Sequence, residues 1–163
     1  MSLSDTDQSA LSVQSPASQL DRLAETLPDS VKASLCAFGI EMDLQRCVSG
    51  CNETYRHRCR ISIHGSAQCS IEIEADSQAC MDLYEGATGL SSSIPDELDE
   101  SLAEFANQIL GHAKTQVELP DSQLGLPQFF TAEQSNSRCK SPSHIYQFDG
   151  KGSIQIRFFP DLN

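Results

Sequence analysis

The chain has 163 residues, of which 39% are hydrophobic and 21% charged, and its formal net charge is −12. This size predicts one compact domain, and the negative charge argues against binding to nucleic acid or to an anionic membrane surface. Residues 1–18 lack the cationic start and apolar core of a secretory signal, and no apolar run approaches the ~20 residues that span a bilayer. We therefore expect a cytoplasmic protein with a disordered leader at 1–18 and a single domain at 19–163.

The first half of the domain predicts one helix followed by strands. Leucines and valine at helical spacing predict a helix from about Asp21 to Ala37, with a break or a new helical start at Pro28. Alternating apolar residues predict a strand over Glu41–Cys47. The same alternation predicts a hairpin with arms at Arg58–His64 and Ala67–Ala75, joined by a Gly-Ser turn.

Two helices are expected next. Asp76 or Ser77 can cap a short helix that runs to Tyr84, and the Gly, Ser and Pro residues of 86–95 predict a loop. A long central helix is then expected from about Pro95 to Gln116, with acidic residues in its first turn as the helix dipole favours.

The chain is expected to end in strands. A Pro- and Gly-marked apolar stretch covers Leu124–Phe130, and strands are expected at His144–Phe148 and Ser153–Phe159 around an Asp-Gly-Lys-Gly turn. The order of the elements predicts an α+β fold, a single domain with a largely antiparallel β-sheet packed against helices.

A small basic patch stands out in this acidic chain. It comprises Arg56, His57, Arg58 and Arg60. We interpret it as the solvated end of a strand.

The seven cysteines raise the alternative of a thiol or metal protein. Cys47 and Cys51 form the one close pair, and Cys59 follows nearby. The spacing lacks a second ligand pair, and a structural zinc site needs four convergent ligands. Buried, reduced thiols are therefore expected, and no metal site is predicted.

The central helix separates into two faces when each residue is advanced by about 100° on a helical wheel. Glu104, Asn107, Gly111 and Lys114 share the arc that is expected to face outward. A Gly inside a helix costs roughly 1 kcal/mol relative to Ala, and it is reasonable where another backbone must approach closely. The opposite arc is apolar and is expected to face the core: Leu98, Leu102, Phe105, Ala106, Ile109, Leu110 and Ala113.

The string from Glu104 to Thr115, EFANQILGHAKT, resembles the E-x-A-N-x-x-x-G-N-A-K-T signature of the CheX members of the CheC/CheX/FliY phosphatases. The acidic lead-in at 96–100, the hairpin and the Leu-Pro stretch are similar to that family in pattern. His112 replaces the usual Asn. Glu133 and Asn136 repeat the Glu-x-x-Asn spacing without the rest of the signature, so we expect one site, as in CheX.

The resemblance implies a phosphatase that hydrolyses the aspartyl-phosphate of a CheY-like response regulator in chemotaxis or two-component signalling. Asn107 would orient the attacking water, and Glu104 would dock on the regulator's Lys. Gly111 and Lys114 would contact the partner, although Lys114 is equally explained by its place near the helix C-terminus. The chain would need no cofactor of its own, because Mg²⁺ is expected on the regulator, and it would form a homodimer. The alternative is a non-catalytic CheX-like adaptor that binds a response regulator.

Overall fold

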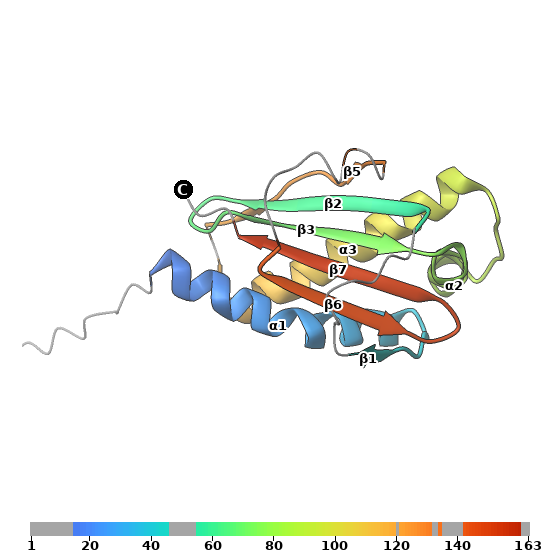
Figure 1. Ribbon diagram of the computed structural model, residues 1–163, viewed down its shortest axis with the longest axis horizontal. Helices are drawn as coiled ribbons and strands as arrows, with labels where there is room; N and C mark the ends of the chain where they lie inside the picture. The colour runs from blue at the N-terminus through green and yellow to red at the C-terminus, as the bar shows by residue number, and fades with distance from the viewer. Residues whose placement is uncertain (1–14, 46–54, 120, 132–133, 135–141, 161–163) are drawn as a thin grey trace, which may run out of the picture.

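The structure, a computed structural model, describes residues 15–45, 55–119, 121–131, 134 and 142–160. Three helices and seven strands lie in these ranges, and all the strand pairs are antiparallel. The predicted α+β fold is therefore confirmed (Figure 1). The helices are α1 (Pro16–Ala37), α2 (Ser77–Thr88) and α3 (Pro95–Val117), and the strands are β1 (Asp43–Gln45), β2 (His57–His64), β3 (Cys69–Ala75), β4 (Gln123–Leu124), β5 (Gln128–Phe129), β6 (His144–Asp149) and β7 (Ser153–Pro160).

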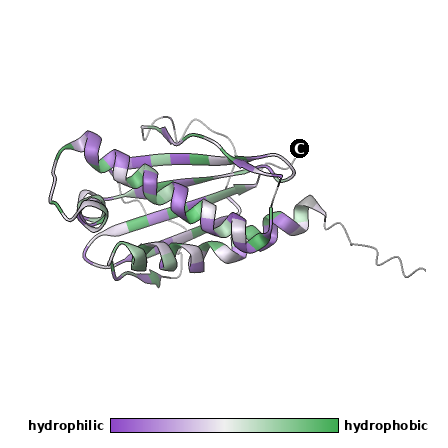
Figure 2. Cartoon of the chain, turned by 180° about the vertical axis from the view of Figure 1, so that it is seen from behind, coloured by the Kyte–Doolittle hydropathy of each residue, from purple (hydrophilic) through white to green (hydrophobic). Residues whose placement is uncertain are grey.

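The sheet has the order β1-β6-β7-β3-β2-β4, and β5 also pairs with β2. Strands β1 and β4 thus lie at opposite edges. Helices α1 and α3 lie side by side across one face of the sheet, as the view from behind shows (Figure 2). None of the helices in the described ranges is long and apolar enough to cross a bilayer.

The core lies between this sheet face and the helices. Alternate residues of β2, β3 and β7 point into it, because side chains on a strand alternate between the two faces. Every residue of the predicted apolar stripe of α3 is buried, with an exposed fraction between 0 and 3%. The core-facing side of the central helix is therefore confirmed.

Helix α1 differs from its prediction at both its start and its middle. It begins at Pro16, within the predicted leader, and Ser15 caps it by accepting a hydrogen bond from the Ser18 amide. Residues 1–14 of the leader lie outside the described residues. The expected break at Pro28 is wrong, since the helix runs through it. Proline cannot donate to the carbonyl four residues earlier. That carbonyl, on Ala24, accepts instead from the Tyr146 hydroxyl at 2.7 Å.

The loop expected from residue 86 begins later, because α2 continues to Thr88. Gly86 does not end the helix. It lies inside α2, where its lack of a side chain lets the helix pack closely against Phe38. A Cβ at this position would lie 2.2 Å from the Phe38 carbonyl oxygen. The helix ends instead at Gly89, which adopts a left-handed conformation with φ 72°.

The predicted strands are confirmed with shifted ends. β1 covers three residues of the Glu41–Cys47 prediction, whose last two residues lie outside the described ranges. The 124–130 stretch pairs with β2 as two short strands, interrupted by Gly125 and Pro127. The two hairpins form as predicted.

The solvated interpretation of the basic patch is wrong for three of its four residues. Arg56 is exposed, but His57, Arg58 and Arg60 are 6 to 8% exposed. The two arginines lie on the sheet face away from the core. The antiparallel register places Glu74 beside Arg58 and Glu72 beside Arg60, and each forms an ion pair with its neighbour. The charges are thus neutralised within the sheet.

Candidate functional site

Helix α3 is held against the rest of the fold just before the predicted site. Asp99 Oδ1 lies 2.8 Å from His57 Nδ1 of β2. The Ser101 hydroxyl donates to the Leu98 carbonyl at 2.8 Å and lies 3.3 Å from the Cys80 carbonyl of α2. The start of the helix is also favourable, with proline in its first turn and two acidic residues near the positive end of the dipole.

The four predicted site residues lie on the side of α3 away from the core. Glu104 is exposed, and Asn107, Gly111 and Lys114 are partly exposed. The residues between them face inward, because Phe105, Ala106, Ile109 and Leu110 are fully buried. The structure therefore brings the four residues together along about three turns of one rigid helix. Figure 2 shows hydrophilic residues along this outward side.

Gly111 has room for a larger side chain on this face. A Cβ built there would meet only the Leu124 side chain, at 3.9 Å, which is ordinary van der Waals contact. The fold itself therefore does not require glycine at this position, and the helical backbone conformation does not require it either. The Thr115 hydroxyl donates to the Gly111 carbonyl at 2.9 Å, one turn later.

The Glu104 carboxylate has one neighbour on the helix that the sequence analysis did not predict. Gln108 Nε2 donates to Glu104 Oε1 at 3.3 Å, and both side chains are exposed. The pair has the i, i+4 spacing at which helical side chains meet. That spacing is the signal in the sequence that could have revealed it.

A second missed arrangement is partly buried, where β2, α2 and α3 meet. His57 Nε2 is 3.3 Å from the Ser77 hydroxyl, and its other ring nitrogen faces Asp99. The order of groups is that of a Ser-His-Asp triad. With His57 only 6% exposed and one residue each from β2, α2 and α3, we interpret this cluster as a structural tie.

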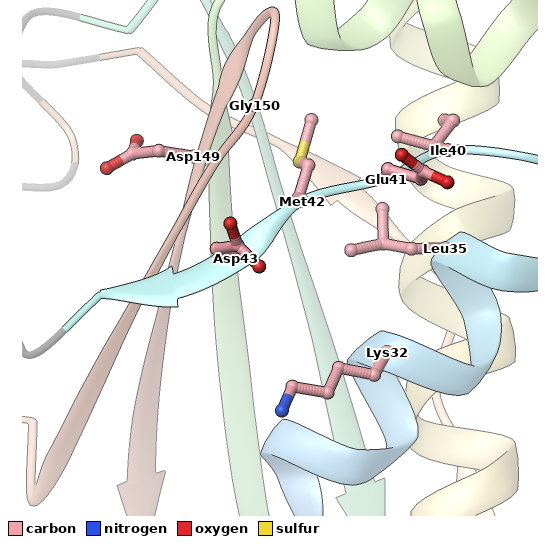
Figure 3. A pocket seen from close by; sticks show the side chains of 8 residues that line it. All are labelled: Lys32, Leu35, Ile40, Glu41, Met42, Asp43, Asp149 and Gly150. Carbon is pink, nitrogen blue, oxygen red and sulfur yellow. The ribbon is translucent and has the colours of Figure 1, made fainter.

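The two described cavities lie away from the outward face of α3. One, of about 420 Å³, opens between α1, β1 and the β6–β7 turn and is lined by Lys32, Glu41 and Asp43 among others (Figure 3). This cavity lies beside β1 at one edge of the sheet, whereas Gly111 lies next to β4 at the opposite edge. The other, of about 570 Å³, includes Phe38, Asp82 and Lys151. Neither of these two cavities is lined by a residue of the outward face of α3.

The described part of the chain offers no metal centre. No group of three or more His, Cys, Asp or Glu side chains in it could hold a metal ion. Cys59 is buried in the core, and this burial raises the pKa of its thiol to about 12, which disfavours the thiolate that a metal needs. Cys47 and Cys51 lie outside the described residues, as do Glu133 and Asn136.

Comparisons with known proteins agree on one family. Residues 58–150, more than half of the chain, match the family described as chemotaxis phosphatase CheX. No curated protein matches the sequence. Solved structures do, among them the chemotaxis protein CheX of Desulfovibrio desulfuricans, with a TM-score of 0.68 and 16% identity over 85% of this chain and 99% of that one.

Two further structures are similar. The chemotaxis protein CheX of Vibrio vulnificus has a TM-score of 0.62 and 17% identity, and covers 83% of this chain and 98% of that one. A chain of the CheX-CheY-BeF3-Mg²⁺ complex from Borrelia burgdorferi has a TM-score of 0.63 and 16% identity, and covers 83% and 95%. The match of residues 58–150 includes the whole outward face of α3, and this chain belongs to the CheX family of chemotaxis phosphatases.

Proposed function

We propose that this chain hydrolyses the aspartyl-phosphate of a CheY-like response regulator, with Asn107 orienting the water and Glu104 docking on the regulator. Family membership supports the phosphatase activity. The partner is supported by the relative from Borrelia burgdorferi that was solved together with CheY. The observation that carries the residue assignment is the outward face of α3, where Glu104, Asn107 and Gly111 stand above a fully buried stripe.

An exposed helix face suits a reaction in which the partner supplies the pocket. In aspartyl-phosphate hydrolysis the water oxygen attacks phosphorus in line with the leaving group. The bond from phosphorus to the aspartyl oxygen breaks, the carboxylate is regenerated, and the water proton leaves with inorganic phosphate or passes to solvent. The regulator would supply Mg²⁺ and the Lys that binds phosphate. This chain would supply a group that positions the water and groups that dock on the regulator.

Asn107 suits that task better than a carboxylate. Its amide can donate and accept a hydrogen bond, so it can hold a water between itself and the phosphoryl group. It adds no negative charge beside the phosphoryl oxygens. Its effect on the rate would come from orientation and from the loss of freedom of the water, and not from basicity.

Glu104 would meet a cation and not the phosphate. Three residues before Asn107, it lies on the same side of the helix. A carboxylate placed there can pair with the regulator's Lys and fix how the two proteins dock. Gly111, one turn beyond Asn107, would leave room for a loop of the regulator. The position of Lys114 in the last turn of α3 is explained by the helix dipole, and a contact with the partner is the further role that we propose.

The experiment is a phosphate-release assay with a phosphorylated CheY-like regulator and Mg²⁺. The native chain should accelerate release, and Asn107→Asp should lose most of that acceleration, by about 100-fold, while binding is retained. Glu104→Ala should lose activity mainly through weaker binding. Glu85→Ala is the matched control, because it removes the same charge from an exposed helical residue of α2, outside the face of α3, and should leave activity unchanged.

The assay also separates the catalytic proposal from the adaptor. Binding of the regulator with no change in its rate of phosphate release would support the adaptor. Near-native turnover by Asn107→Asp would contradict the role of the amide. The homodimer that the family resemblance implies stays a prediction, which light scattering of the purified protein would test.

A further inference from the structure

The Glu104 side chain is held at one of its two oxygens. Gln108 Nε2 donates to Oε1 at 3.3 Å, whereas no described residue contacts Oε2 within hydrogen-bond distance. The exposed Gln108 side chain makes no other described hydrogen bond and takes no part in the core. Its contact with Glu104 is therefore what its side chain contributes to this face.

The kind of donor at position 108 matters. A neutral amide restricts the rotamers of the carboxylate but leaves its negative charge uncompensated. A lysine at the same place would form a Glu-to-Lys i, i+4 ion pair, in the favourable orientation along the helix, and would neutralise that charge. If an exposed carboxylate must bind a cation on another protein, a neighbouring glutamine should strengthen that binding and a neighbouring lysine should weaken it.

We propose that Gln108 is a positioning residue, which orients the Glu104 carboxylate so that Oε2 is ready to receive an ammonium group from the regulator. The inference rests on the proposed function, since it assumes that Glu104 meets a cation of the partner. Immobilising the Glu104 side chain on binding has an entropic cost. The hydrogen bond from Gln108 already restricts this side chain in the free protein, so less conformational entropy is lost when the partner binds. The expected benefit is about two- to tenfold in affinity.

Two substitutions at position 108 test this. Gln108→Met keeps the length and the helix propensity but removes the donor. It should raise both the KM for the phosphorylated regulator and the Kd for its beryllofluoride and Mg²⁺ form by about two- to tenfold, with kcat within about twofold of the native value. Gln108→Lys should raise KM and Kd further than Gln108→Met does, because it competes with the partner's cation for the same carboxylate.

A double-mutant cycle distinguishes positioning from a general effect on the helix. In a Glu104→Ala background, Gln108→Met should have no further effect on KM or Kd, because the group that it positions is gone. An equal effect in both backgrounds would overturn the proposal. So would unchanged KM and Kd for Gln108→Met in a chain where Glu104→Ala is strongly impaired, and that result would leave the proposed function standing. If Glu104→Ala itself binds and turns over normally, the docking role fails and the inference fails with it.

Discussion

Replacing Gly111 with alanine should separate stability from activity. Alanine is favoured over glycine inside a helix by about 1 kcal/mol. The new Cβ would lie 3.9 Å from Leu124 Cδ1, so no clash reduces the gain. We therefore expect the free energy of unfolding to rise by about 0.5–1 kcal/mol and the Tm by about 1–4 °C.

Activity should change in the opposite direction. The added methyl group would project from the outward face of α3 at the point where the partner is proposed to approach. Phosphate release from the phosphorylated regulator should slow, chiefly through a higher KM. Thermal unfolding and steady-state kinetics on the same preparation of Gly111→Ala would measure both effects.

Gly86→Ala is the matched control for the stability measurement on Gly111→Ala. It is the same substitution inside a helix, but here the Cβ would lie 2.2 Å from the backbone carbonyl oxygen of Phe38, which cannot rotate away. This variant should lose stability, by about 1–3 kcal/mol. A loss of stability in Gly111→Ala would refute the packing argument. A more stable Gly111→Ala with native KM and kcat would refute the view that glycine leaves space for the partner.

Three other substitutions or reactions test the fold. Glu74→Ala should cost about 3–5 kcal/mol in denaturant unfolding, because it leaves two buried or partly buried guanidinium groups without their shared carboxylate. Tyr146→Phe should cost about 1–3 kcal/mol by the same measurement, since the carbonyl freed by the proline in α1 loses its donor. Alkylation of the native protein at pH 8, mapped by mass spectrometry, should label the exposed Cys36 but not Cys59. The pKa of the Cys59 thiol, raised by burial to about 12, keeps that group protonated there.

The central helix could be predicted because its sequence pattern and its burial have the same cause. An amphipathic helix on a sheet must bury one arc, so the apolar stripe determined which residues face outward. Glu104 and Asn107 therefore followed from the wheel and from the resemblance together. Neither residue would have stood out by spacing alone, since Glu133 and Asn136 have the same spacing.

The charged face of the sheet could not be predicted from the sequence in the same way. Arg58 and Arg60 read as solvated because their partners are distant in sequence. Glu72 and Glu74 come into contact with them only when the β2–β3 register is formed. Pro28 is a similar case, because the hydroxyl that replaces its missing hydrogen bond comes from a residue more than 100 positions later. Local patterns do not contain these long-range partners.

The contacts that hold α3 explain how an exposed helix face can still present its residues in a defined position. Asp99 bonds to β2, Ser101 bonds to α2, and the stripe behind them is buried, so the helix backbone at Glu104 and Asn107 is fixed by its surroundings. What remains free is the rotation of the exposed Glu104 and partly exposed Asn107 side chains. Neither described cavity encloses these side chains, so a neighbour on the same helix can restrict their rotation instead. Gln108 is the described neighbour that contacts Glu104. Precision at this site should therefore depend on single hydrogen bonds between exposed side chains.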